Sequence, residues 1–145
     1  EIRLSLVGSE MCIRDRIIIF DLGTATTISV VDKNNNYIGG VIMPGMGISL
    51  NAMVSGTSQL PRISLEEPKK IIGSNTVDCM KSGILYGTAS SMDGMIERIK
   101  EEIGEAKVVA TGGLASTVVP HCKNDIILDD ELLLKGLMII YNKNI

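Results

Sequence analysis

Residues 17–31 read IIIFDLGTATTISVV, and this stretch decides the fold. Its first part, Ile17 to Phe20, is a continuous apolar run that ends at Asp21, which is typical of a buried strand. Its last part, Thr26 to Val31, is rich in β-branched residues, which favour strands. The short turn between the two parts predicts that they pair as a hairpin.

The segments that follow alternate between strand and helix signals. A polar turn at 32–36 precedes a third predicted strand, Tyr37 to Met43, which Pro44-Gly45 ends. The longest helical pattern runs from Thr76 to Ile103, with Asn75 as its cap and Gly104 as its stop. The other predicted elements are a helix at 48–54, an irregular connection at 60–70, strands at 107–111 and 126–128, a helix at 114–119, and a final amphipathic helix that Asp130 caps and that ends near Tyr141. This order predicts an α/β domain in which helices flank a mixed sheet.

The composition narrows the classes of function. Of the 145 residues 45% are hydrophobic and 21% are charged, which is typical of a globular domain. The net charge of -3 gives no attraction for the phosphates of a nucleic acid, and the aromatic content of 3% leaves few rings on which bases could stack. Both values disfavour nucleic-acid binding. No apolar run approaches the roughly 18 residues that span a bilayer, so we expect a soluble protein without a membrane partner.

Three cysteines, an odd number, favour a reducing cytoplasm as the location. They form no zinc-site spacing with the single histidine. His121 and Cys122 are adjacent, but a ligand pair of this kind would still need further partners.

The first sixteen residues, EIRLSLVGSEMCIRDR, show no clear strand or helix period. Part of this stretch resembles a translated sequencing-adapter read-through. We therefore interpret residues 1–16 as a non-native leader and residues 17–145 as the domain. The alternative is a genuine N-terminal arm.

The segment from Asp21 to Thr27, DLGTATT, follows the opening strand directly. A carboxylate at this edge can hold a cation, while a Gly-Thr turn lets backbone N–H groups and a hydroxyl approach phosphate oxygens. The alternative is an ordinary hairpin turn in which Asp21 caps backbone amides.

A second turn, Thr111-Gly112-Gly113-Leu114, also follows a predicted buried strand and precedes a helix, where exposed N–H groups favour anions. Two such turns would lie at the same edge of one sheet, which suggests a nucleotide site. For the glycines at 39–45, a turn and a bulge explain the pattern as well as a ligand site does. For residues 73–76, helix capping explains it as well as ligand binding does.

The long helix carries two further features. Gly83 and Gly87 stand one turn apart, which predicts a face where another backbone comes close, in the core or in a subunit contact. Asp78, Asp93 and Glu97 could be considered as catalytic bases. We interpret them instead as charges on the solvent-exposed side of the helix.

Five segments together resemble the C-terminal half of a type III pantothenate kinase, from the superfamily of sugar kinases, actin and heat-shock ATPases. They read DLGTATT (21–27), GGVIMPG (39–45), LPR (60–62), GSNTVDCMKSG (73–83) and ATGGLA (110–115). The resemblance covers residue 17 to about residue 144. It implies a ribonuclease H-like domain, one of the two domains of an actin-like ATPase.

The resemblance also implies site residues and ligands. Asp21 corresponds to the ligand of a monovalent cation, K⁺ or NH₄⁺, and Gly23 and Thr24 to the turn that contacts the ATP phosphates. Gly112 and Gly113 lie where the loop on the adenosine side passes, and Thr76 corresponds to a pantothenate contact. The implied reaction transfers the γ-phosphoryl group of Mg²⁺-bound ATP to pantothenate, the first step of coenzyme A synthesis, in a homodimer.

The sequence departs from the family pattern in one respect. The family's phosphate loop and its Gly-Ala-Asp-Arg motif, which supplies the general base, have no counterpart here; Arg14-Asp15-Arg16 lacks the Gly-Ala. Loss of a general base costs about 10² to 10⁴ in rate. We therefore expect this polypeptide alone to be inactive. The alternatives are a non-catalytic nucleotide-binding or regulatory module, and a sugar kinase of the same superfamily.

Overall fold

A computed structural model describes residues 15–145 of the chain. Residues 1–14 of the segment interpreted as a leader therefore lie outside the described residues. Five strands form one sheet in the order β3-β2-β1-β4-β5. Their bounds are β1 Arg16–Leu22, β2 Ala25–Val31, β3 Tyr37–Pro44, β4 Ala106–Thr111 and β5 Ile127–Leu128.

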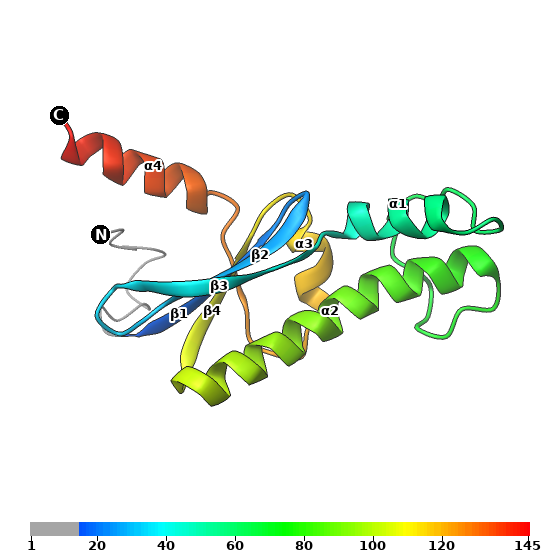
Figure 1. Cartoon of the computed structure of the whole chain (residues 1–145), viewed down its shortest axis with the longest axis horizontal. Coiled ribbons are helices and arrows are strands. Elements are labelled where there is room, and N and C mark those ends of the chain that lie inside the picture. Colours follow the sequence, from blue (N-terminus) through cyan, green and yellow to red (C-terminus); the bar gives the residue numbers. More distant parts are fainter. Residues whose placement is uncertain (1–14) are drawn as a thin grey trace.

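Strand β1 lies at the centre of this mixed sheet (Figure 1). It pairs antiparallel with β2, which confirms the predicted hairpin, and parallel with β4. Strand β3 pairs antiparallel with β2, with an irregular register at Val30 and Val31. The helices are α1 Met46–Gly56, α2 Thr76–Ile103, α3 Ala115–Val118 and α4 Leu132–Lys143, with a 3₁₀ turn η2 Val119–His121. The expected α/β architecture of a ribonuclease H-like domain is thus confirmed.

One face of the sheet is the core. Alternate strand residues, including Ile18, Phe20 and Leu22 of β1, point to this face and are almost fully buried. Helix α2 covers it (Figure 1). The apolar residues that recur at spacings of three and four along this helix face the core: Met80, Ile84, Met92, Ile96 and Ile99 are buried, and Met95 and Ile103 are partly buried. The inward-facing residues of the strands and the apolar residues of α2 therefore pack together in one cluster.

The predicted ends of α2 are confirmed. The side chain of Asn75 accepts a hydrogen bond from the Asp78 N–H at 2.9 Å. Gly104 ends the helix with φ at 91°, a conformation that favours glycine. Asp78 thus belongs to the helix cap.

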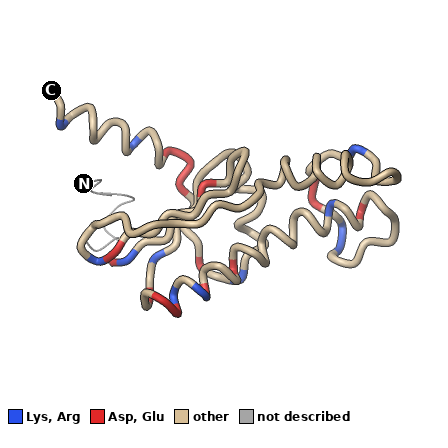
Figure 2. The backbone as a smooth tube through the Cα atoms, in the orientation of Figure 1, with Lys and Arg blue, Asp and Glu red and all other residues tan. Residues whose placement is uncertain are grey.

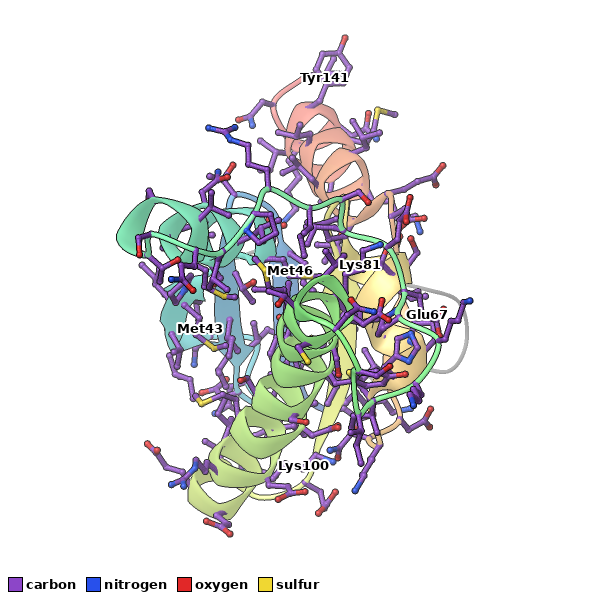
Figure 3. The ribbon with its side chains drawn as sticks, turned by 90° about the vertical axis from the view of Figure 1, so that its right-hand side faces the viewer. Met43, Met46, Glu67, Lys81, Lys100 and Tyr141 are labelled. Atoms are coloured by element: carbon purple, nitrogen blue, oxygen red, sulfur yellow. The ribbon has the colours of Figure 1, made fainter. Side chains whose placement is uncertain are left out.

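The connection between α1 and α2 has no helix or strand, as expected, and is fastened to its neighbours by polar contacts. Lys81 of α2 forms an ion pair with Glu66 at 3.0 Å, which lowers the pKa of that carboxyl. His121 lies 3.5 Å from Glu67, and the Ser82 hydroxyl donates to the carbonyl of Ile71. Figure 3 shows Lys81 and Glu67 on this side of the molecule.

The glycines at 39–45 have a structural role. Gly39 has φ at 133°, and a Cβ on Gly40 would lie 2.0 Å from the carbonyl oxygen of Ile28. A Cβ on Gly45 would lie 2.2 Å from the carbonyl oxygen of Thr24. These close approaches explain the motif as a bulge and a turn.

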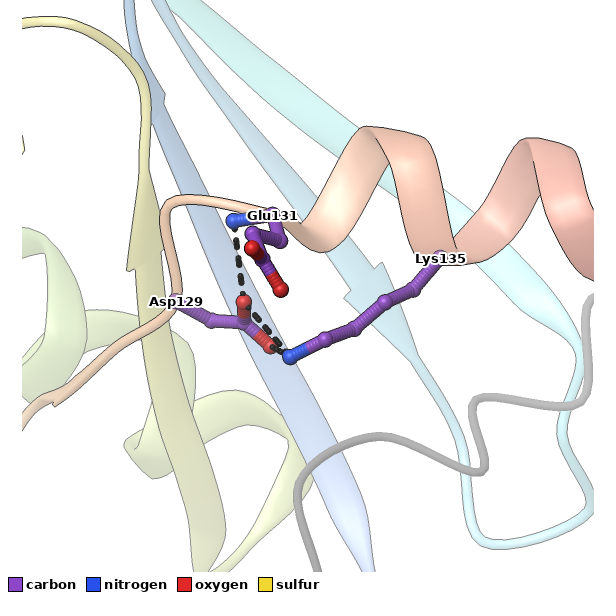
Figure 4. A network of polar contacts seen from close by, with 3 residues as sticks. All are labelled: Asp129, Glu131 and Lys135. Atoms are coloured by element: carbon purple, nitrogen blue, oxygen red, sulfur yellow. Dashed lines mark hydrogen bonds and ion pairs between the residues drawn. The ribbon is translucent and has the colours of Figure 1, made fainter.

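Two expectations about α3 and α4 need correction. The element after Gly113 is shorter than predicted, because α3 ends at Val118 and a 3₁₀ turn follows. Asp130 does not cap α4; the residue before it, Asp129, is buried and accepts the Glu131 N–H at 3.1 Å (Figure 4). Lys135 also reaches Asp129, at 2.9 Å. Helix α4 is amphipathic as predicted, and most of its apolar residues are exposed.

In residues 15–145 no helix combines the length and the apolar character that a membrane span requires.

Candidate functional site

The second face of the sheet, opposite the core, carries a row of three oxygen-bearing side chains. Asp21 of β1 is the register partner of Thr27 on β2 and of Thr111 on β4. Register partners point to the same face, and neighbouring strands lie about 4.8 Å apart. The row Thr27–Asp21–Thr111 therefore places one carboxylate between two hydroxyls.

This polar row forms one end of a groove of about 960 Å³. Strands β1, β2 and β4 line its floor, and α4 forms its wall. Away from Asp21 and Thr111 the lining is mixed: Ile19, Val31 and Leu137 are apolar, while Asn35 and Asn36 add polar groups beyond β2. The groove thus combines a largely apolar lining with a few polar groups, a combination that is common in small-molecule sites.

The two predicted turns lie at one edge of the sheet. Gly112 has φ at 99°, and a Cβ there would lie 2.7 Å from the backbone of Leu22. The Leu114 N–H donates to the Leu22 carbonyl at 3.3 Å, which joins the turn after β4 to the end of β1. Asp21 and Gly112 thus lie at the same end of two neighbouring strands, but Asp21 lines the groove and Gly112 does not. Gly112 is required here because no other residue fits so close to the neighbouring backbone.

The remaining residues of the predicted site are placed differently. Gly23 and Thr24 form the exposed β1–β2 turn near this edge, and the Gly23 N–H donates to the Ala25 carbonyl at 3.2 Å. Gly113 is exposed, with open space around it. Thr76 begins α2 at the end that lies beside α1 and away from the sheet (Figure 1), so it does not join Asp21 in the groove.

None of the other carboxylates considered as a base lines the groove. Asp15 precedes β1 and lies 4.0 Å from Lys107, at the opposite end of the strand from Asp21, about 20 Å away at 3.3 Å per residue. Glu97 is exposed on α2, on the core side of the sheet.

Asp93 corrects the interpretation of helix charge, because this carboxylate is buried rather than solvated. It accepts hydrogen bonds from the Lys123 N–H at 2.8 Å, and from the N–H and side-chain amide of Asn124, each at 2.9 Å. Burial alone would raise its pKa, but these hydrogen bonds outweigh it and lower the pKa of Asp93. Asp93 therefore anchors the 122–124 loop to α2.

The described residues 15–145 contain no cluster of three or more His, Cys, Asp or Glu side chains that could hold a metal. Burial, with a contribution from Asp93, raises the pKa of the Cys122 thiol to about 11. Cys122 is therefore a protonated thiol at neutral pH, and its neighbour His121 packs edge-on against Tyr86 with ring centroids 5.2 Å apart.

Two residues of the site, Thr27 and Thr111, were not singled out from the sequence. Both stand in the motifs quoted above, but neither has a spacing or a neighbour that marks it in the sequence. The signal is the register: a hairpin turn centred on Thr24 pairs Leu22 with Thr26 and therefore places Thr27 opposite Asp21 across the strands.

Comparison with known proteins places the chain in a family. The family model for type III pantothenate kinase matches residues 4–98. The chain is 45% identical over 129 residues to the type III pantothenate kinase of Halalkalibacterium halodurans, and 41% identical over 142 residues to that of Rhodospirillum rubrum. These alignments cover 88% and 97% of this chain but only 51% and 55% of the relatives. The chain therefore spans about half the length of the curated relatives it matches.

Solved structures share the fold at low identity. A conserved Baf family protein from Campylobacter jejuni matches 96% of this chain and 67% of its own, with a TM-score of 0.61 at 20% identity. Bacillus thuringiensis ParM with ATP matches 95% of this chain and 50% of its own, with a TM-score of 0.58 at 12% identity. These likenesses support the fold, and the family model together with the curated relatives supports the family. The chain belongs to the type III pantothenate kinase family.

Proposed function

We propose that this chain forms one wall of the site in which a pantothenate kinase transfers the γ-phosphoryl group of ATP to pantothenate. One observation carries the proposal: the row Thr27–Asp21–Thr111 lines one groove, and the Gly112 turn follows Thr111 directly. The named activity of relatives at 41–46% identity supplies the reaction. A kinase of this kind would act in the cytoplasm, where ATP is available.

The chemistry of these residues fits a monovalent cation next to phosphates. Hard cations take oxygen ligands, and the row offers one carboxylate and two hydroxyls. A single carboxylate suits the lower charge of K⁺ or NH₄⁺. Mg²⁺ is commonly bound through one or two carboxylates plus substrate phosphates, so it would arrive with the nucleotide.

The residues of the chain have separate roles in this proposal. Asp21 holds positive charge at the end of β1, and the exposed Thr24 and Gly113 are free of steric cover where phosphate oxygens would approach. When bound, ATP supplies the phosphoryl group and the cations neutralise its charge. Phosphoryl transfer depends mainly on positioning and on charge stabilisation, which a rigid sheet edge can provide. Thr76, proposed as a pantothenate contact, would serve a different part of the assembled enzyme.

Titration calorimetry of the 145-residue chain with ATP and Mg²⁺, in KCl and in NaCl, tests the proposal. We expect binding that is tighter in KCl and that weakens about tenfold or more in Asp21→Asn, since the variant loses the carboxylate that holds the cation beside the phosphates. Asp125→Asn, which removes an exposed carboxylate outside the groove, should leave the affinity unchanged. Equal ATP affinity of the wild type and Asp21→Asn would refute the assignment of the phosphate end.

A turnover assay separates the kinase from a non-catalytic nucleotide-binding module. The chain alone should release no ADP in the presence of pantothenate, because the family's general-base motif has no counterpart in its sequence. A fusion that adds the remaining half of the Halalkalibacterium halodurans enzyme should release ADP with pantothenate and not with sugars. A fusion that binds ATP without turnover would favour the module.

A further inference from the structure

The connection between α1 and α2 is long for a segment that has no helix or strand. It runs over residues 57–75, at the end of the domain where α1 lies beside the start of α2 (Figure 1). Connections in compact domains commonly have about 4–6 residues, and irregular ones of more than about 12–15 residues usually carry a function. We call residues 57–75 the strap.

Two glutamates that are adjacent in the sequence hold the strap against the domain. Glu66 Oε2 lies 3.0 Å from Lys81 Nζ on α2, and Glu67 Oε1 lies 3.5 Å from His121 Nε2 on η2. The two basic side chains are each only 15% exposed, whereas the glutamates are 71% and 63% exposed. Figure 2 shows acidic and basic segments gathered on the strap and on the neighbouring turns of α2. The domain thus fixes the two basic groups, and the strap supplies carboxylates that can move into water.

The apolar contacts of the strap are incomplete. Leu60, Ile63 and Leu65 pack against the core cluster but stay partly exposed, and Ile72 is exposed. A void of about 10 Å³ remains between the strap and α2. Contacts of this kind, together with ion pairs of exposed carboxylates, contribute little stability each. Opening of the strap should therefore require much less free energy than unfolding of the sheet.

The last part of the strap runs close over the first turns of α2. The hydroxyl of Ser82, which is buried, donates to the Ile71 carbonyl. A Cβ on Gly73 would lie 2.5 Å from the backbone nitrogen of Cys79, so the strap and the helix approach closely at this point. These contacts join the strap to the N-terminal end of α2.

The strap ends in the cap of α2. The side chain of Asn75 accepts from the Asp78 N–H, and its carbonyl accepts from the Cys79 N–H, each at 2.9 Å. Thr76 follows directly as the first residue of the helix. A movement of the strap would therefore reach the cap and Thr76.

We propose that the strap is a gate that opens and closes as one unit, that Glu66 and Glu67 hold it closed, and that its closure fixes Thr76. Gly56 and Gly73 stand near its two ends, where hinge residues would absorb the movement. We assigned Thr76 to pantothenate, so the gate would control the pantothenate side of the enzyme. That consequence rests on the proposed function, whereas the gate itself does not.

Limited digestion of the 145-residue chain with trypsin tests the gate. Arg62 and Lys70 are exposed on either side of the glutamates, and cleavage follows the population of the open form when opening is fast relative to cleavage. We expect Glu66→Gln to speed cleavage at both sites about threefold, and Glu66→Gln/Glu67→Gln to speed it about tenfold. Glu105→Gln is the matched control, because it removes an exposed ion pair of 3.5 Å outside the strap and should change neither rate.

Further controls separate opening from a local effect of the lost charge on trypsin. Each rate is divided by that of a synthetic peptide of residues 57–75 with the same substitution. Lys81→Met breaks the same ion pair without changing the strap, so it should also speed cleavage about threefold and leave Glu66→Gln without a further effect. Cleavage after Lys33, in the exposed turn between β2 and β3, and the melting temperature should stay at their wild-type values.

Amide hydrogen exchange tests the link to Thr76. The Asp78 and Cys79 amides bond to Asn75, so their exchange reports on the cap that precedes Thr76. We expect both amides, together with those of the strap, to exchange about tenfold faster in the double glutamate variant. Unchanged cleavage in this variant, or faster cleavage at only one of the two sites, would overturn the gate. Unchanged exchange of the Asp78 and Cys79 amides would overturn its link to Thr76.

Failure of the gate and failure of the proposed function can be told apart. The double glutamate variant should bind ATP as the wild type does, and Asp21→Asn should keep the wild-type cleavage rates of the strap. A failed ATP experiment therefore leaves the cleavage result intact, and a failed cleavage experiment leaves the ATP result intact.

Discussion

The two faces of the sheet are built from alternate residues of the same strands, yet they differ in almost every respect. On the core face, Ile18, Phe20 and Leu22 are buried under α2 in one large cluster. On the groove face, Ile17 belongs to a small cluster, Ile19 is only partly buried, and Asp21 is exposed. A single strand thus supplies the core with one set of side chains and the candidate site with the other.

This difference indicates how the domain divides stability from function. A face closed by a 28-residue helix can hold the fold without help. A face left open can hold a carboxylate in water and leaves room for a ligand. Substitutions that alter one face and leave the other unchanged test this difference.

The largest effect is expected from Phe20→Ala. Phe20 is fully buried on the core face, and truncating such a side chain leaves a cavity that costs about 3–5 kcal/mol of unfolding free energy. Ile19→Ala, the adjacent position on the groove face, should cost only about 1 kcal/mol because its side chain is partly exposed. Urea unfolding of both variants measures the difference. Equal losses would show that the groove face contributes to the core as much as the face under α2.

Gly112→Ala tests the close approach of the turn after β4 to the backbone at the end of β1. The φ of 99° strains any L residue, and the new Cβ would lie 2.7 Å from the Leu22 backbone, so we expect a loss of about 2–3 kcal/mol. Gly113→Ala is the matched control, because its Cβ would meet no atom within 4 Å, and it should change stability by less than about 0.5 kcal/mol. Similar unfolding curves for the two variants would contradict the close approach.

Much of the fold could be predicted because local signals and the final packing agree. The apolar run at 17–20, the β-branched run at 26–31 and the spacing of Met92 and Ile96 on α2 each point to the face that they occupy in the structure. The shared edge of Asp21 and Gly112 followed from general rules for where strands end.

What the sequence did not predict depends on contacts between distant residues. Lys135 reaches back six residues to Asp129, so α4 begins later than its acidic residues suggest. Thr111 becomes a neighbour of Asp21 only through parallel pairing across 90 residues of chain. The sequence of α4 is largely apolar, but only the structure shows that the other described residues leave most of its apolar side chains exposed.

Asp93→Asn gives the smallest of these effects and tests the residue that sequence analysis misread. The variant keeps one acceptor oxygen but turns an amide N–H₂ towards a backbone donor, so we expect a loss of about 2 kcal/mol at pH 7. Because folding lowers the pKa of Asp93, its carboxylate stabilises the fold above the unfolded-state pKa near about 3.9, and this contribution is lost as the pH falls through the lower folded-state value. The gap between wild type and variant in urea unfolding should therefore narrow progressively below about pH 4. Glu97→Gln, one turn further along α2 and exposed, should show no gap at either pH, and a gap for Asp93→Asn that persists in acid would mean that its hydrogen bonds do not depend on charge.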